Sequence, residues 1–135
     1  MKCFDLKGRP ANIKVADYSI DWDKKVSLPQ YECKQFLRPY WKDDVVCEEM
    51  RLPKSLLRID LTNWNKRIVV EVSPPHHTTF SPFFHRSLAG YRASIKRDLD
   101  KVKWAELNGF LFIEITDDDL PLSPKWFLEK HQVTL

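Results

Sequence analysis

The sequence lacks most features that would assign it to a specialised class. Its three cysteines, Cys3, Cys33 and Cys47, form no CxxC pair, so neither a disulfide framework nor a cysteine zinc site is predicted. No stretch approaches the about 18 apolar residues of a membrane span, and the first residues lack the apolar run of a signal peptide. We therefore expect a protein of the reducing cytoplasm with no membrane segment.

The net charge is small, and glycine is scarce. The net charge is only +3, which permits a polyanionic partner without requiring one. Three glycines stand against nine prolines, and we find no repeat or flexible linker. With 135 residues and 43% hydrophobic side chains, we expect one globular domain. Within it, residues 1–26 form an arm or extra strands, 27–120 the core, and 121–135 a C-terminal helix.

The apolar spacing predicts a helix, three strands, a helix, a strand and a final helix. Ser27 can cap the first helix, and Pro29 suits its first turn. The long second helix allows a parallel crossover between the third and fourth strands. The fold class is therefore α/β, with a mixed four-stranded sheet flanked by helices. The predicted ranges are about 28–38, 45–47, 56–61, 68–72, 88–108, 110–115 and 123–129.

Two carboxylates interrupt otherwise apolar strands. An ionised Asp60 or Glu71 is costly to bury unless a cation or hydrogen-bond donors compensate it. Their separation of 11 residues fits neighbouring antiparallel strands joined by the turn at 63–66. Paired carboxylates suit Mg²⁺, which assists phosphodiester hydrolysis. The alternative is that Asp60 caps a turn and Glu71 points to solvent.

The order of these residues resembles the PD-(D/E)XK nuclease superfamily, especially its compact branch of very-short-patch repair endonucleases and their phage and homing relatives. The resemblance covers about residues 27–120. It consists of a polar residue on the first helix, Arg58-Ile59-Asp60 and Val70-Glu71-Val72 on adjacent strands, a histidine soon after, and Asp98 to Lys101 on a later helix. It implies a restriction-endonuclease-like αβββαβ core.

The resemblance implies a magnesium-dependent DNA endonuclease in the cytoplasm of a bacterium or a phage-infected cell, with Mn²⁺ as a substitute metal. Asp60 and Glu71 would hold the metal, and Glu49 is a weaker candidate. The family's lysine two residues after the acid is missing, because Ser73 stands there. The repair branch uses a histidine instead, and His77, six residues after Glu71, fits that role, although Pro74-Pro75 precede it.

Three further residues complete the expected site. Asp98 would support the metal or His77 through a hydrogen bond, and Lys101 would steady a phosphate or replace the missing lysine. The alternative is a solvated helix face of mixed charge. On the first helix we favour Gln30, with Glu32 as the alternative.

Contacts to DNA are expected from basic and aromatic side chains outside this site. An aromatic loop with two histidines and an arginine could stack on bases, although such aromatics more often complete a core. The tryptophans are expected to pack, with Trp64 at a strand turn the exposed exception. The predicted DNA-contacting residues are Arg58, Trp64, His76, His85, Arg86 and Arg97.

Two other functions remain open. The first is a non-catalytic DNA-binding or assembly module that has kept the nuclease fold, as the Ser73 and Pro74-Pro75 departures suggest. A small hydrolase could instead bind Zn²⁺ or Ni²⁺ through Glu71 and the histidines His76, His77 and His85, with a spacing that matches no known motif. A double-strand cut needs two sites, so a homodimer is a further expectation.

Overall fold

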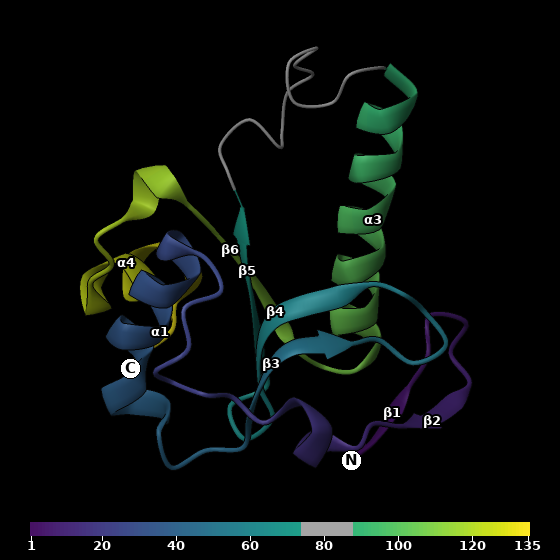
Figure 1. The fold of residues 1–135 in the computed structure, drawn as a ribbon, viewed down its shortest axis with the longest axis horizontal. Helices are drawn as coiled ribbons and strands as arrows, with labels where there is room; N and C mark the ends of the chain where they lie inside the picture. Colours follow the sequence, from purple (N-terminus) through teal and green to yellow (C-terminus); the bar gives the residue numbers. More distant parts are fainter. Residues whose placement is uncertain (74–87) are drawn as a thin grey trace.

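Four strands form the central sheet, in the spatial order β3-β4-β5-β6 (Figure 1). The computed structural model describes residues 1–73 and 88–135. The strands are β3 Val46–Arg51, β4 Arg58–Asn63, β5 Ile68–Ser73 and β6 Leu111–Thr116. β3, β4 and β5 are antiparallel neighbours and β6 runs parallel to β5, so the predicted mixed sheet is confirmed.

The helices cover both faces of this sheet. The helices are α1 Leu28–Trp41, α3 Leu88–Leu107 and α4 Pro124–His131. α1 and α4 lie on one face and α3 on the other (Figure 1). The hydroxyls of Ser27 and Ser123 accept backbone N–H bonds at the starts of α1 and α4, as N-cap residues do. The protein is therefore a mixed α/β fold. None of the described helices is long and apolar enough to cross a membrane.

The end of α1 differs from the prediction. The expected end at about residue 38 was wrong, because the helix continues through Pro39 to Trp41. Proline lacks only one backbone donor, whereas the fully buried Trp41 side chain anchors the last turn in the core. Tertiary burial thus outweighs the local preference to stop before proline.

Each face of the sheet buries its own apolar cluster. On the α1 and α4 face the cluster includes Leu37, Leu61, Val70, Ile113 and Phe127. On the α3 face it includes Cys47, Ile59, Val69, Trp104 and Phe110. Because successive residues of a strand point to opposite faces, this two-sided burial explains why β5 is almost continuously apolar.

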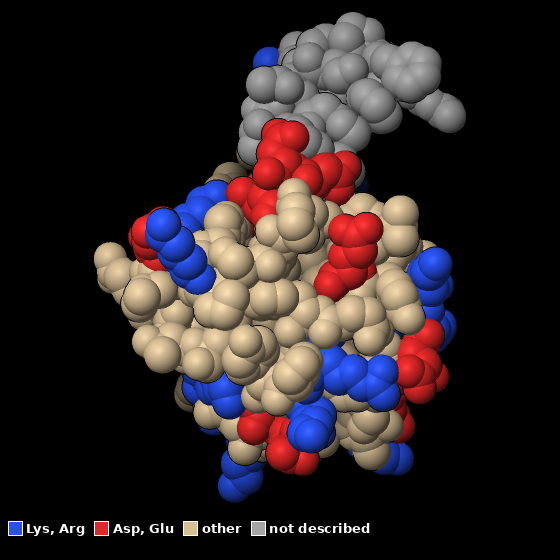
Figure 2. All heavy atoms as spheres, turned by 90° about the vertical axis from the view of Figure 1, so that its left-hand side faces the viewer, with Lys and Arg blue, Asp and Glu red and all other residues tan. Residues whose placement is uncertain are grey.

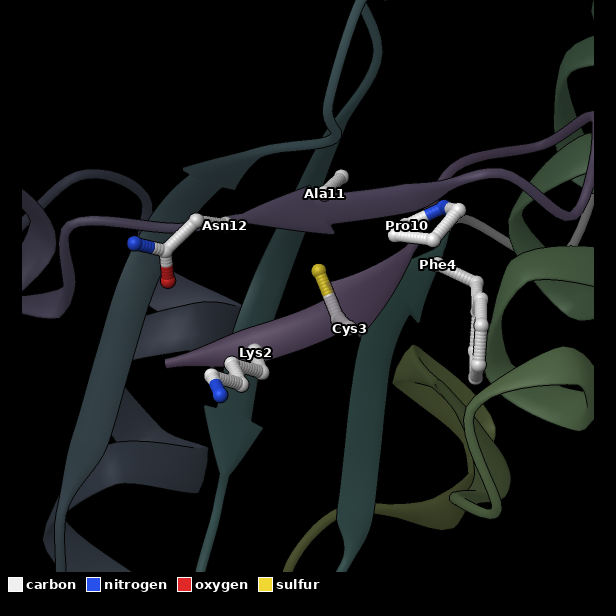
Figure 3. Close-up of a pocket in the computed structure, with 6 residues that line it drawn as sticks. All are labelled: Lys2, Cys3, Phe4, Pro10, Ala11 and Asn12. Atoms are coloured by element: carbon white, nitrogen blue, oxygen red, sulfur yellow. The ribbon is translucent and has the colours of Figure 1, made fainter.

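The N-terminal segment adds extra strands rather than an extended arm. β1 Lys2–Phe4 and β2 Pro10–Asn12 pair as a separate antiparallel hairpin, followed by the short helix η1 Val15–Tyr18. Phe4 lies beside α3 (Figure 3), where its backbone N–H donates to Asn108 Oδ1 at 2.7 Å and its carbonyl accepts from Asn108 Nδ2. These contacts fix the hairpin on the α3 side of the sheet.

Candidate active site

Asp60 and Glu71 lie opposite each other where β4 and β5 part. The last paired residues are Leu61 and Val70, and the same register places Asp60 opposite Glu71. The backbone ladder does not continue there. Instead Asp60 Oδ2 accepts a hydrogen bond from the Val72 backbone N–H at 2.8 Å. The side chain of Asp60 therefore bridges the opening strands, and the expected juxtaposition of the two carboxylates is present.

Burial makes this carboxylate pair electrostatically costly. Glu71 is only 7% exposed. Burial, followed by the charge of Asp60, raises the pKa of Glu71 to about 9. Burial also raises the pKa of Asp60, although the Val72 N–H and a hydrogen bond with Glu71 oppose that shift. Near neutral pH the pair therefore retains a proton that a bound cation would displace.

Lys101 brings a positive charge to this pair from α3. Its Nζ lies 3.2 Å from Glu71 Oε1, and its side chain is 18% exposed. Their contact is an ion pair. Apart from it, Glu71 Oε1 is a buried oxygen that accepts no hydrogen bond from the part of the chain that the structure describes. A further ligand at this oxygen would share it with Lys101.

A second polar cluster lies beside the pair, between α1 and β3. Gln30 Nε2 donates to Glu48 Oε2 at 3.0 Å and to Glu49 Oε1 at 3.2 Å. The fully buried Lys34 ammonium lies 2.9 Å from Glu48 Oε2. Burial, then the charge of Asp60, raises the pKa of Glu49. The protonation of Glu49 therefore depends on the charge of Asp60.

The two candidate polar residues of α1, Gln30 and Glu32, have different surroundings in the structure. Gln30 is 4% exposed and points to the acidic cluster, whereas Glu32 is exposed. Sequence reasoning overlooked Glu48 and Lys34. Their signal was the position of Lys34 on the apolar stripe of the helix, between Cys33 and Leu37, where an unpaired lysine would be costly.

A hollow of about 350 Å³ opens beside Glu71, between α3 and the edge of the sheet. Its lining combines acidic and apolar side chains: Glu71, Ser73, Ile95, Asp98, Leu99, Val102, Phe112 and Glu114. Asp98 thus lies across the same hollow as Glu71, and Glu114 is the parallel register partner of Glu71. The position of Asp98 is compatible with its expected supporting role.

Another hollow, of about 630 Å³, lies on the β1–β2 hairpin (Figure 3). It is lined by Lys2, Cys3, Phe4, Pro10, Ala11 and Asn12. This lining is mainly apolar, with Lys2 as its one charged side chain, and contains no carboxylate. The smaller hollow beside Glu71 is therefore the better candidate for a metal or substrate site.

The donor set beside this hollow fits magnesium. Among residues 1–73 and 88–135, no group of three or more His, Cys, Asp and Glu side chains is arranged to hold a metal ion. Magnesium needs only one or two carboxylates, because water and substrate phosphate complete its coordination. The carboxylates of Asp60 and Glu71 meet that requirement.

The prediction for Trp64 was wrong, because this side chain is 3% exposed. The turn after β4 folds its indole into the core, edge-on to Trp104 and Phe110, with the Arg67 guanidinium over its ring. Packing against two aromatic rings outweighs exposure at a strand turn. Trp64 is therefore unavailable to DNA.

The other predicted DNA contacts divide into two groups. Arg58 and Arg97 are exposed, so both side chains are accessible to a phosphate. His76, His77, His85 and Arg86 lie outside the described residues, as do Pro74 and Pro75. The histidines of the Zn²⁺ or Ni²⁺ alternative belong to the same undescribed segment.

Three comparisons with known proteins found no match. No family model, curated protein or solved structure matches this chain. The functional argument therefore depends on the residues and geometry of the site.

Proposed function

We propose that the protein is a magnesium-dependent DNA endonuclease with a restriction-endonuclease-like core, related to the compact repair branch of the PD-(D/E)XK superfamily. The observation that carries the proposal is the buried pair of Asp60 and Glu71 at the point where β4 leaves β5. Two carboxyl groups buried side by side are costly to ionise, and a bound divalent cation would offset that cost.

Each residue of the site has its own role in this proposal. Asp60 and Glu71 would hold Mg²⁺, or Mn²⁺ in its place, and the ion would supply positive charge to the phosphodiester and lower the pKa of water. The Val72 N–H fixes the orientation of the Asp60 carboxylate. Lys101 offers the scissile phosphate an ammonium. His77 would take the proton from the attacking water and Asp98 would support it, as the family resemblance implies.

The order of the elements supports the same class. The helix α1 precedes three antiparallel strands, and the long helix α3 then leads to the parallel strand β6. This αβββαβ order is the one that the resemblance implies. Asp60 and Glu71 lie on its second and third strands, in the positions expected of the acidic residues.

A cleavage assay tests this proposal. Supercoiled plasmid and a panel of branched DNAs are incubated with Mg²⁺, Mn²⁺ or EDTA. We expect metal-dependent cutting by the wild type and a loss of about 100-fold or more in Asp60→Asn and Glu71→Gln. Glu106→Gln is the matched control, because Glu106 is an exposed carboxylate elsewhere on α3. Full activity in Asp60→Asn would rule out the proposed site.

One observation favours a second function, a non-catalytic DNA-binding or assembly module. Lys101 and the retained proton already neutralise much of the charge on Glu71 without a metal ion. If neither Mg²⁺ nor Mn²⁺ binds in calorimetry or raises the melting temperature, while DNA raises it, this module becomes the better description.

A further inference from the structure

The basic side chains are unevenly distributed over the chain. Residues 1–17 and 50–58 hold seven of the 22 Lys and Arg residues but only two of the 19 Asp and Glu residues. Because the whole chain has a net charge of +3, the remainder carries a slight negative excess. These two segments are therefore one source of electrostatic attraction for a polyanion, and residues 92–103 of α3, with five Lys and Arg against two Asp, are another.

The fold joins the two segments into one surface. The hairpin and η1 lie beside the β3–β4 turn (Figure 1), and Lys54 Nζ lies 3.8 Å from Asp5 Oδ2 across that contact. A shared, mainly polar hollow of about 230 Å³ lies there, and its polar lining is Asn12, Lys14, Asp17, Tyr18, Arg51 and Lys54. We call Lys14, Arg51, Lys54 and Arg58 the basic surface.

The charges of the basic surface are available to a ligand. Lys14 and Lys54 are 78% and 62% exposed, and Arg51 and Arg58 are also exposed. Lys14 lies 3.9 Å from Asp17, a weak surface ion pair. The other acid, Asp5, is 3% exposed and also accepts the Lys7 and Arg9 backbone N–H groups and Arg9 Nε, so it offsets Lys54 only in part.

The basic surface leads directly to the carboxylate pair. Arg51 and Arg58 are register partners on β3 and β4, so like charges face each other across the strands. Like charges directly opposite each other on neighbouring strands are destabilising, and a bound anion would relieve that repulsion. Arg58 is two residues before Asp60, a distance of about 7 Å along the strand. A chain of phosphates passing Asp60 would therefore continue over Arg58 and Arg51.

The face that carries α1 and α4 has an acidic upper edge, where η3 Asp117–Asp119 lies, and its Lys and Arg side chains lie mostly lower down (Figures 1 and 2). The acidic edge would repel a polyanion. This repulsion favours approach from the basic surface.

We propose that the basic surface binds the phosphate backbone of DNA on one side of the Asp60 and Glu71 pair, and so positions the strand to be cut. This proposal rests on the nuclease function proposed above. The ligand is a nucleic acid backbone, because the cations extend over two strands and a turn instead of converging on one anion.

The test measures binding separately from cleavage. A fluorescently labelled DNA duplex is titrated with protein in EDTA at several salt concentrations, and anisotropy gives the association constant. The variants are Arg51→Gln and Lys54→Gln, and the matched controls are Lys42→Gln and Lys125→Gln, exposed cations of the α1 and α4 face. We expect each surface variant to bind on the order of fivefold more weakly near 0.1 M salt and to lose about 0.9 from the salt slope.

The outcomes separate this proposal from the proposed function. If the surface variants bind as the controls do at every salt concentration, the basic surface is not the DNA-binding surface, whether or not the protein cuts DNA. If Arg51→Gln and Lys54→Gln lose binding to anionic lipid vesicles and not to DNA, the proposal also fails. If they lose DNA binding while the wild type cuts no substrate, the surface stands and the nuclease function fails.

Discussion

The Lys101 ammonium on α3 lies 3.2 Å from Glu71 Oε1 on β5, although 30 residues separate them in the chain. This ion pair joins the helix that covers one face of the sheet to the carboxylate pair at its open end. Ser73 stands where the family resemblance would place a lysine on the strand, and under the proposed function Lys101 would supply that cation from a different element. Two predictions follow from this site, one on the rate of DNA cleavage and one on the pH dependence of stability.

Replacing Lys101 by methionine should lower the DNA cleavage rate by about 100-fold, because a preorganised cation beside the scissile phosphate would be lost. The folded structure should persist, since methionine retains most of the apolar length of the lysine side chain. Single-turnover cleavage rates measure the effect. Lys103→Met, an exposed lysine of the same helix, is the control and should cut at the wild-type rate. Equal rates for both variants would show that Lys101 has only a structural role.

The stability of the metal-free protein should fall as the pH rises through the neutral range. Burial raises the pKa of Glu71 to about 9, so the folded state holds a proton that the unfolded chain releases at lower pH. That stabilisation is complete at low pH and is lost as the pH approaches the folded pKa. Raising the pH from about 6 to about 9 in EDTA should therefore lower the melting temperature, and Glu71→Gln should flatten the decrease.

Magnesium should reverse part of this pH dependence. A metal ion binds the deprotonated carboxylates, so the rise in melting temperature caused by Mg²⁺ should be larger at about pH 9 than at about pH 6. Differential scanning fluorimetry with Mg²⁺ or EDTA at each pH measures it. Glu106→Gln should behave as the wild type. A pH-independent effect of Mg²⁺ would show that the ion binds away from Glu71.

Local sequence signals were sufficient to predict much of the sheet and the pairing of the carboxylates. Ser27 and Ser123 have the side chains that cap helices, and both helices start beside them. The 11 residues between Asp60 and Glu71 fit a hairpin, and the register of Leu61 with Val70 places them opposite. These features depend on neighbours close in the chain, which a sequence pattern records.

Features that depend on distant segments could not be predicted. Residues 1–26 show no hydrophobic periodicity, because their two strands have only three residues each. Their hairpin is held by a distant residue, Asn108. Lys34 was passed over because lysine is normally exposed, and its partner Glu48 lies on another element. Trp64 was expected to be exposed because the rings that bury it are distant in the chain: Trp104 of α3 and Phe110, which precedes β6.

Lys34 and Glu48 should be mutually dependent for stability. Lys34 is fully buried, with Nζ donating to Glu48 and to the backbone carbonyls of Asp21 and Lys24. Lys34→Met should lower the free energy of unfolding by about 3–5 kcal/mol, because it leaves a buried carboxylate without its charge partner. In urea denaturation, Lys34→Met combined with Glu48→Gln should cost clearly less than the sum of the two single changes. Additive losses would show that the two side chains do not act as a pair.

Trp64 should matter for stability and not for DNA. Truncation to alanine removes an indole that packs against Trp104 and Phe110, so Trp64→Ala should cost about 3–5 kcal/mol of unfolding free energy. Trp64→Phe keeps an aromatic ring in the cluster and should lose less. DNA affinity of the folded Trp64→Phe variant should equal that of the wild type, because an indole that is 3% exposed cannot stack on a base. Weaker DNA binding by a fully folded Trp64→Phe protein would mean that the indole leaves the core when DNA binds.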